Sequence, residues 1–440
     1  MRRLATKEKV QPVNPQASIV IPIYNGLPFA RACVASIYRT AGELPFEVIA
    51  VDNGSAPDIG EWIAHEHPGI VYVHDPKPLG FARAVNRGAA VARGRTLVVL
   101  NSDTVVTRGW LEGLDGALSA DPQLGVVSPM TNRAGEAALV EAAAFDVTAA
   151  SAEEYAARRR AAPEVLVLPQ RIPFFCAAFR TEVWRELGSL DESFEGGNFE
   201  DDDFCLRARL AGYRLGVARH IFIYHQESAT FHANRIDHRR TMRNNAVRFA
   251  EKAAAAALAE PGSRRWPKAE IPDVSVVIDA FAGGSLDVTL RSLANQTVTG
   301  FEVVLPGQTV HGSFVAYARQ GDILYPFHVE ALRDVLRREH AQAVHANWAA
   351  RSKTLLADRR SQQPPRGAWM HRRELDPARL FELTRPIHWP RMTWESRSAS
   401  EKDSVAEDEF VDTRNMREFA RGVYRGLVPY RTRLRIDRAV

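Results

Sequence analysis

Cysteine is scarce in this sequence of 440 residues. Only Cys33, Cys176 and Cys205 are present, far apart and without the spacing of a zinc site. An odd number of scattered cysteines excludes a disulfide-framed secreted domain and favours a reducing compartment.

Long hydrophobic runs are also missing. No stretch approaches the ~18 apolar residues that cross a bilayer, and the charged start MRRLATKEK lacks the apolar segment of a signal peptide. We therefore expect a cytoplasmic protein, with any membrane contact peripheral at the inner face of the membrane.

The excess of positive over negative charge is small. Lysine and arginine number 57 against 53 acidic residues, which gives a net charge of +4 and a sequence pI of about 9.0. This balance suits an anionic substrate or membrane surface, and without a basic patch we expect no nucleic-acid partner.

What the chain does contain is a regular alternation of apolar strands and helical periodicity. This alternation is typical of a doubly wound, mostly parallel α/β sheet. Residues 141–170, rich in alanine and arginine, are expected to form a helical insertion or a mobile loop near the ligand crevice. The expected strands are 18–23, 46–52, 70–74, 96–100, 126–130, 173–180 and 215–225, and the expected helices are 29–40, 59–67, 79–92, 110–120, 181–187, 200–212 and 235–259.

Polar residues follow the strands of this predicted sheet, among them Asn25, Asp52, Asn53 and Asp103. In open α/β sheets, ligands bind outside the carboxyl ends of the strands, so these side chains are expected at one crevice. Asp52 is equally explained as a turn former before Asn53.

The central stretch is residues 96–104, TLVVLNSDT, in which an apolar strand runs directly into Asn101, Ser102 and Asp103. Alone, it is more typical of a strand that ends in a turn, with Ser102 or Asp103 capping the next helix. When the other polar strand ends are considered as well, the interpretation changes: Asp103 is a ligand of a divalent cation, and the cation holds a diphosphate.

Two later features support this interpretation. Four successive acids, Glu200–Asp203, follow two glycines and start a helix; acids suit a helix N-terminus, but four in a row repel one another and exceed the need for capping. His225 ends a strand, where a lone histidine is most often structural but here joins the other motifs.

From residue 273 the order strand, helix, strand recurs over 275–281, 286–293 and 301–307, so we expect an internal repeat of the fold. The polar residues do not recur, and the segment that begins at Gly321 is aligned with the one that begins at Gly94. The expected parts are a mobile arm (1–16), a first α/β domain (17–262), a degenerate copy (271–395), and a linker with a basic tail (396–440) that either lies on an anionic membrane or packs on the protein itself.

The first 260 residues resemble glycosyltransferase family 2, which has the GT-A fold. The resemblance covers a little over half of the chain. The residues of its motifs are most similar to the bacterial rhamnosyltransferase branch, which has Asn-x-Asp where other members have Asp-x-Asp. The motifs that carry it are IPIYN (21–25), VDNGS (51–55), LGFARAVN (79–86), LNSD (100–103), GNFEDDD (197–203) and His225.

The resemblance implies a nucleotide-sugar donor and a role for each motif. Asp52 would accept a hydrogen bond from the imide of a uracil or thymine base, and Gly80 would let the diphosphate approach the backbone. The implied nucleotide-binding residues are Pro22, Tyr24, Asn25, Asp52, Asn53, Gly80, Phe81, Asn86 and Ser102.

The resemblance also implies a metal site and a base. Asp103 and His225 would hold Mg²⁺ or Mn²⁺ against the diphosphate, with affinity lowered because Asn101 replaces a carboxylate. Asp201 would be the general base for the acceptor hydroxyl, and Glu200 and Asp203 would assist it or bind acceptor hydroxyls.

The predicted function is therefore an inverting, metal-dependent transfer of a sugar to a glycan or lipid-linked acceptor in bacterial polysaccharide synthesis. Two alternatives stay open. A nucleotidyltransferase would need a glycine-rich basic loop after the first strand, where residues 24–28 (YNGLP) offer none. A glycan-binding scaffold without catalysis fits the second half of the chain better than the first.

Overall fold

The computed structural model divides the chain into two units, residues 1–246 and 247–440. The expected basic tail, and nearly all of the expected arm, lie outside the described residues. None of the helices in the described part of the chain has the length and apolar character needed to span a membrane. The structure describes residues 14–134, 139–140, 142–161, 166–167, 169, 171–226, 238–259, 272–279, 285–298, 300–338, 343–351, 356–359, 369–374 and 387–396.

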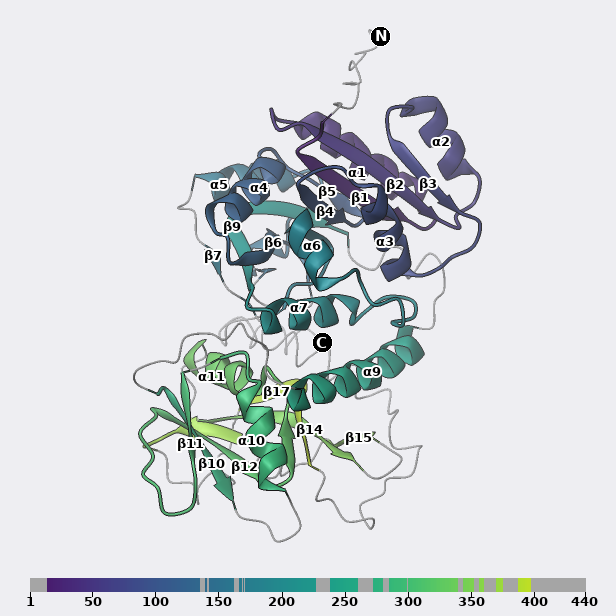
Figure 1. The fold of residues 1–440 in the computed structure, drawn as a ribbon. Coiled ribbons are helices and arrows are strands. Elements are labelled where there is room, and N and C mark those ends of the chain that lie inside the picture. The colour runs from purple at the N-terminus through teal and green to yellow at the C-terminus, as the bar shows by residue number, and fades with distance from the viewer. Residues whose placement is uncertain are drawn as a thin grey trace, which may run out of the picture. The chain divides into compact units, whose positions relative to one another are not determined.

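Unit 1 is built on one mixed sheet with the strand order β3-β2-β1-β4-β8-β6-β9-β5 and with β7 paired to β9 (Figure 1). Its strands are β1 (Ala17–Ile23), β2 (Phe46–Asn53), β3 (Val71–Asp75), β4 (Thr96–Leu100), β5 (Thr104–Val105), β6 (Leu124–Thr131), β7 (Leu166–Val167), β8 (Cys176–Arg180) and β9 (Arg214–His225). Its helices are α1 (Leu27–Thr40), α2 (Asp58–Glu66), α3 (Phe81–Val91), α4 (Trp110–Ala120), η2 (Ala142–Ala144), α5 (Ala152–Arg160), α6 (Thr181–Leu187) and α7 (Glu200–Leu210), and α9 (His238–Leu258) crosses into the second unit.

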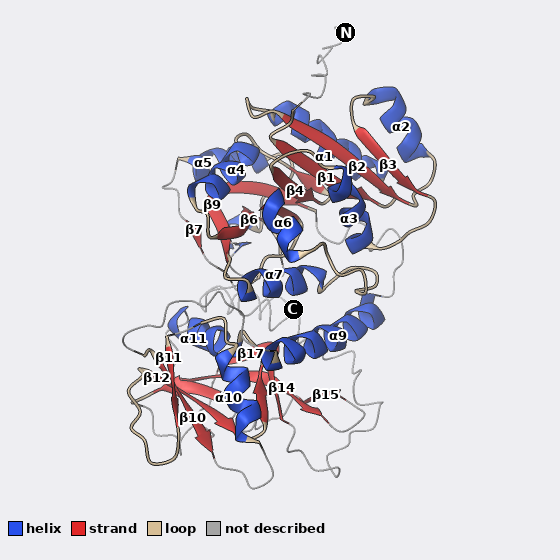
Figure 2. Cartoon of the chain, viewed as in Figure 1, coloured by secondary structure: helices blue, strands red, loops and turns tan. Residues whose placement is uncertain are grey.

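Helices cover both faces of this sheet (Figure 2). Successive residues of β1 point to opposite faces, so Ile19 and Ile21 join the core under α1, α2, α4 and α5, whereas Val20 joins the core under α3, α6 and α7. The expected helical insertion is present as α5, where Tyr155 packs edge-on against Phe222 of β9 with 4.6 Å between ring centroids.

The expectation of a mostly parallel sheet needs correction. Strands β1 to β4 are parallel, but β8 pairs antiparallel with both β4 and β6. The reason is where β8 starts: the Asn101 backbone N–H donates to the Phe175 carbonyl at 2.8 Å, so the chain enters β8 from the edge at which β4 ends. It can then only run back along β4.

Unit 2 contains a second sheet with the order β11-β10-β12-β16-β14-β17-β13 and with β15 paired to β14. The strands are β10 (Val274–Asp279), β11 (Phe301–Val304), β12 (Phe314–Arg319), β13 (Asp322–Leu324), β14 (Ala343–Arg351), β15 (Leu356–Arg359), β16 (Trp369–Arg372) and β17 (Ile387–Ser396), with helices α10 (Leu286–Ala294) and α11 (His328–Arg338).

Within the described residues, this second sheet repeats the order of the first from β2 to β5, without a counterpart of β3. β10 lies between β11 and β12 in parallel pairings, as β1 lies between β2 and β4. The next pairings, β12 with β16, β16 with β14, β14 with β17 and β17 with β13, have the directions of β4 with β8, β8 with β6, β6 with β9 and β9 with β5. The predicted repeat is confirmed.

Buried polar contacts recur with it. Ser18 donates to Glu47 at 2.6 Å and receives the Gly94 N–H, and Ser275 in the same way donates to Glu302 at 2.5 Å and receives the Gly312 N–H. Gly312 is therefore the equivalent of Gly94, and the predicted alignment of Gly321 with Gly94 is wrong. Sequence similarity alone misplaced it because residues 305–313, between β11 and β12, stand where residues 54–95, with α2, β3 and α3, lie between β2 and β4.

The unit boundary also differs from the predicted one at residue 262. It falls within α9, because the later turns of this helix pack with unit 2. Phe249 stacks on Phe327 with 6.1 Å between ring centroids, and the Asn295 amide donates to the Ala257 carbonyl at 2.8 Å.

Candidate active site

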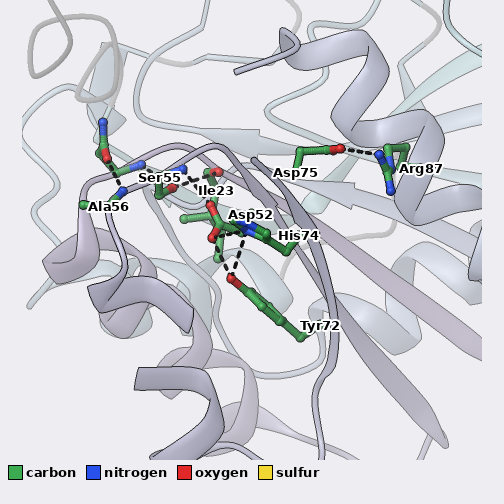
Figure 3. A network of polar contacts seen from close by, with 9 residues as sticks. Ile23, Asp52, Ser55, Ala56, Tyr72, His74, Asp75 and Arg87 are labelled. Carbon is green, nitrogen blue, oxygen red and sulfur yellow. Dashed lines mark hydrogen bonds and ion pairs between the residues drawn. The ribbon is translucent and has the colours of Figure 1, made fainter. Parts of the chain in front are cut away.

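The carboxyl ends of β1 to β4 meet at one edge of the first sheet, as predicted. Hydrogen bonds tie the loops that follow β1 and β2 to each other (Figure 3). The Asn25 N–H donates to the Ser55 hydroxyl at 2.8 Å, and the Ala56 N–H donates to the Asn25 amide oxygen at 3.1 Å. Asn25 has a positive φ of 55°, which this pair of contacts stabilises. Pro22, the last residue but one of β1, and the half-buried Tyr24 lie beside it.

Asp52 is buried at this edge, with both carboxylate oxygens engaged. One oxygen accepts the Ser55 N–H at 2.9 Å; the other accepts the Tyr72 hydroxyl at 2.6 Å and lies 3.1 Å from His74 Nδ1. Burial favours the neutral acid, but the hydrogen bonds from Tyr72 and Ser55 outweigh it and lower the pKa of Asp52. The turn-forming role expected as an alternative is present, and Figure 3 shows the two β3 side chains converging on the same carboxylate.

Asn53 and Gly80 connect β2 to the start of α3. The Asn53 amide oxygen accepts the Leu79 N–H at 2.7 Å, and its nitrogen donates to the Gly80 carbonyl at 3.4 Å. Gly80 has a φ of 89°, and a Cβ there would lie 3.6 Å from the Gly196 nitrogen. The predicted diphosphate wall and the loop before the acidic helix are therefore adjacent.

Asn86, predicted to face ribose and diphosphate, forms hydrogen bonds with other residues of the chain. Its amide donates to the Leu190 carbonyl at 2.9 Å and its oxygen accepts the Leu190 N–H at 2.9 Å. It also donates to Glu192, which Arg83 holds at 2.7 Å. Asn86 thus fixes the 190–192 segment along α3, while Phe81 at the start of that helix packs against the neighbouring core.

The structure brings Asp103 and His225 together. Both are about nine-tenths buried, and His225 Nε2 lies 3.3 Å from Asp103 Oδ1. The contact follows from the pairing of β5 with β9, in which Thr104 opposes His225, and from the Gln226 N–H, which donates to the Asp103 carbonyl at 2.9 Å. Ser102, buried beside them, is the residue between Asn101 and Asp103.

This pair fits a divalent cation. Two ligands about 2.1 Å from one cation lie about 3.0–3.4 Å apart at angles near 90–109°, which matches the 3.3 Å spacing. His225 Nδ1 lies 3.4 Å from the Arg133 carbonyl, and the ring stacks on Phe175 with 5.1 Å between centroids. A proton on Nδ1 leaves the Nε2 lone pair facing Asp103, the arrangement that metal-binding histidines use.

Asp103 and His225 are not joined by a third histidine, cysteine, aspartate or glutamate side chain in the part of the chain that the structure describes. No group of three or more histidine, cysteine, aspartate or glutamate side chains suited to a metal occurs in that part of the chain. A cation here would complete its shell with substrate oxygens and water, as Mg²⁺ and Mn²⁺ in phosphate sites do.

The acidic turn Glu200–Asp203 opens α7 after a strained segment. Gly196, Gly197, Asn198 and Phe199 all have positive φ, between 66° and 90°. Two are glycines and asparagine tolerates this region, but a bulky residue such as Phe199 does not, and it costs of order 1–3 kcal/mol. Such strain is typical of functional sites, where the surrounding structure must sustain it.

The four acids have different partners. Asp202 pairs with Arg171 at 3.0 Å, and the buried Asp203 pairs with Arg207 at 2.9 Å. Glu200 is buried, and its Oε2 lacks a hydrogen-bond partner among the described residues; burial, with the Asp201 charge, raises the pKa of Glu200 to about 8. Asp201 is half-buried. The Asp203–Arg207 pair lies within α7.

The segment 171–175 links the acidic turn to the metal-ligand pair. Arg171 binds Asp202, and Phe175 both receives the Asn101 N–H and stacks on His225. The four Cα–Cα steps from residue 171 to residue 175 span at most about 14 Å, so the segment holds both groups within one region of unit 1.

Several residues of this region were not predicted. Tyr72 and His74 follow the alternation of an ordinary edge strand, Arg171 lies in an irregular segment, and Asn245 lies on α9. Asn245 donates through Nδ2 to the carbonyls of Glu195, Gly197 and Asn198 at 2.9, 3.1 and 3.0 Å. No local pattern marks these positions; only the alternation of Tyr72 and His74 on one face of β3 was available as a signal.

Polar side chains at the carboxyl ends of the strands are typical of a class of α/β proteins that bind ligands at this edge of the sheet. Within that class, residues 18–184 match the sequence model of Glycosyl transferase family 2. The match, with the topology above, confirms the predicted fold class: a GT-A α/β unit followed by a second α/β unit. It also supports the resemblance to glycosyltransferase family 2.

Individual relatives agree with this match. The Pre-mycofactocin glycosyltransferase of Mycobacterium tuberculosis is 30% identical over 217 residues, 46% of this chain and 41% of that protein. Glycosyltransferase GlyG of Streptococcus pneumoniae is 31% identical over 100 residues, 22% of this chain and 33% of that protein. The chain thus spans less than half the length of these relatives.

Solved structures are similar over about half of this chain. The mannosyltransferase PcManGT from Pyrobaculum calidifontis, in complex with GDP-Man and Mn²⁺, has a TM-score of 0.41 and 20% identity, over 54% of this chain and 65% of that one. Residues 1–349 of TarS from S. aureus, in complex with UDP-GlcNAc, have a TM-score of 0.39 and 17% identity, over 54% and 70%.

Proposed function

We propose that the protein is an inverting, divalent-cation-dependent glycosyltransferase. It moves a hexosyl or deoxyhexosyl group from a dTDP-, UDP- or GDP-linked donor to a glycan or lipid-linked acceptor, in bacterial cell-surface polysaccharide synthesis. The observation that carries the proposal is the pair Asp103–His225, 3.3 Å apart at the end of β4. The three cysteines are free and buried, which supports the cytoplasm as the compartment.

Asp103 and His225 would hold Mg²⁺ or Mn²⁺. When bound, the cation neutralises the negative charge that develops on the departing nucleoside diphosphate. The protein's own contribution is orientation: the Arg133 carbonyl, 3.4 Å from Nδ1, would accept a proton carried there, and the β5–β9 pairing sets the distance of His225 from Asp103.

Asp201 is the proposed general base. It takes the proton of the acceptor hydroxyl as that oxygen bonds to the anomeric carbon, while the bond from that carbon to the phosphate oxygen breaks and its electron pair leaves with the diphosphate. One displacement inverts the anomeric centre. Glu200, with its pKa near 8, holds its own proton at neutral pH and serves as a donor to an acceptor hydroxyl.

The nucleotide would lie over the ends of β1, β2 and α3. Pro22, Tyr24 and Asn25 line one side, and Asn53, Gly80 and Phe81 the other, with Ser102 beside the diphosphate. Because both oxygens of Asp52 already accept hydrogen bonds, its contact with a base imide would use a remaining lone pair. Asn86 contributes by holding the 190–192 segment.

Unit 2 is proposed as a copy without a donor site. Thr104 and Asp322 begin the equivalent strands β5 and β13, so Gly321 stands at the position of Asp103, and Ser396 pairs with Asp322 as His225 pairs with Thr104. Counting from Phe46 and Phe301 places Gly307 at the position of Asp52. A sheet edge without these groups cannot hold a cation and a diphosphate, so unit 2 serves structure or acceptor binding.

A donor screen tests the function. Release of nucleoside diphosphate from UDP-, dTDP- and GDP-sugars is measured with Mn²⁺ or Mg²⁺, for the wild type, Asp103→Ala and the control Asp115→Ala. Asp115 is buried at the opposite end of β4, against Thr96. We expect release from at least one donor class by the wild type and by Asp115→Ala, and none by Asp103→Ala.

Titration calorimetry with the preferred nucleoside diphosphate and Mn²⁺ tests unit 2 and should give one site per chain. No release from any donor, together with no nucleotide binding, would overturn the enzyme assignment. A second site that persists in Asp103→Ala would overturn only the assignment of unit 2.

A further inference from the structure

The strained run before α7 needs an external support. Gly196–Phe199 are four successive residues with positive φ, and a chain does not hold such a conformation by itself. They lead directly into Glu200 and Asp201, so the direction in which these two carboxyls point depends on the run keeping its shape.

Asn245 supplies that support from α9. It is 1% exposed, and its single Nδ2 group lies within 3.1 Å of the carbonyls of Glu195, Gly197 and Asn198. Its two amide hydrogens are shared among three acceptors that the left-handed backbone turns inward. Buried carbonyls of this kind are costly to leave unpaired, so the contact and the backbone shape stabilise each other.

The same face of α9 constrains the run a second time. Thr241 lies one turn before Asn245, and a Cβ on Gly196 would lie 3.1 Å from its Cγ2. The helix therefore packs closely on the run and also hydrogen-bonds to it. Asn244, which directly precedes Asn245 in the sequence, is exposed.

We propose that Asn245 is a positioning residue for the acceptor side of the reaction: it clamps the left-handed run so that Glu200 and Asp201 face the acceptor hydroxyl. The inference rests on the proposed function for its catalytic consequence. The clamp itself is a statement about the fold and can be tested without any activity.

The first experiment compares Asn245→Ala with the matched neighbour Asn244→Ala. Hydrogen exchange followed by mass spectrometry should show faster exchange across residues 195–203 in Asn245→Ala only. For transfer to the acceptor, kcat should fall about 10-fold or more, since small misplacements of reacting groups have effects of this size. The KM for the donor and the thermal shift with nucleoside diphosphate and Mn²⁺ should stay as in the wild type.

A second variant separates clamping from general stability. Phe199→Gly relieves the left-handed strain at the bulkiest position of the run, so the double variant Phe199→Gly/Asn245→Ala should recover kcat relative to Asn245→Ala alone. A residue that only stabilised the fold would give additive losses instead. If Asn245→Ala does not fold, Asn245→Ser keeps one donor and should show the same pattern at smaller amplitude.

The outcomes distinguish this inference from the proposed function. Unchanged exchange over 195–203, equal effects of Asn244→Ala and Asn245→Ala, or additive losses in the double variant would overturn the clamp. Absence of transfer by the wild type with every donor would overturn the proposed function, while the exchange comparison would still confirm or refute the clamp.

Discussion

Replacement of Asp103 by asparagine tests the metal-ligand pair most directly. The change keeps the size of the side chain and removes the charge from one of the two groups that lie 3.3 Å apart. Because no further cluster of candidate ligands occurs among the described residues, nothing in that part of the chain replaces it. We expect affinity for a cation-bound nucleoside diphosphate to fall at least about 100-fold, more than the 10–100-fold typical of losing a metal's outer-shell partner.

The expected size of the ligand-induced shift in Tm follows from the linkage between ligand binding and folding. A ligand at 100 times its Kd stabilises the folded protein by about 2.7 kcal/mol, and after a 100-fold loss of affinity by about 0.4 kcal/mol. Unit 1 spans 246 residues, a size at which 1 kcal/mol shifts Tm by about 2–4 °C. The shift should therefore fall from about 5–11 °C to about 1–2 °C.

The assay is thermal melting with UDP, dTDP or GDP, each with and without Mn²⁺, at a fixed multiple of the wild-type Kd. Asp115→Asn is the matched control: Asp115 is buried and bonded to Arg95 at 2.7 Å, so the variant should melt lower without ligand and keep the full ligand shift. Retention of the full shift by Asp103→Asn would refute the reasoning.

Three further predictions concern stability and pH. In Tyr72→Phe, Asp52 loses its closest donor, so the variant should be about 1–3 kcal/mol less stable at neutral pH; because the folded pKa of Asp52 is lowered, the difference should shrink in denaturant titrations as pH falls below about 4, and a pH-independent difference would contradict it. Glu200→Gln should abolish the fall in wild-type Tm between about pH 5 and pH 8, since the folded state with its raised Glu200 pKa binds a proton that the unfolded state releases; parallel Tm curves would refute this. Gly94→Ala should destabilise unit 1, and Gly312→Ala unit 2, because a Cβ would approach backbone atoms to 2.7 and 2.6 Å; calorimetry that shows normal melting of either variant would disprove the close approach.

The repeat shows how far local sequence carries a fold prediction. The order of strands and helices in unit 1 was predictable because apolar periodicity is local, and most element ends agree within two residues. The antiparallel placement of β8 was not, since it depends on the edge at which the chain re-enters the sheet. The alignment of Gly321 with Gly94 failed because spacing changes between copies, whereas the buried Ser275–Glu302 contact identifies Gly312 without ambiguity.

The candidate site, like the fold, was predicted only in part from the sequence. Asp103 and His225 were predicted as a pair from motif order, and their 3.3 Å contact bears out the proximity. Asp203 was predicted to assist Asp201 or bind acceptor hydroxyls, and Asn86 to line the nucleotide site; the contacts of Asp203 with Arg207 and of Asn86 with the 190–192 segment could not be predicted. A sequence shows that a polar side chain is present; its partners come from elements far away in the chain.

The sequence by itself determined which residues could form strands, where those strands end in carboxylates and amides, and that the second half of the chain lacks these groups. Only the tertiary structure decided which of them remain available to a ligand. Asp52 is held by Tyr72 and His74, Glu200 keeps a buried oxygen without a hydrogen-bond partner in the described part of the chain, and Asn245 bonds to carbonyls about 50 residues earlier in a strained loop. The physical reason is that burial and hydrogen-bond saturation are properties of three-dimensional neighbours, which local sequence patterns do not specify.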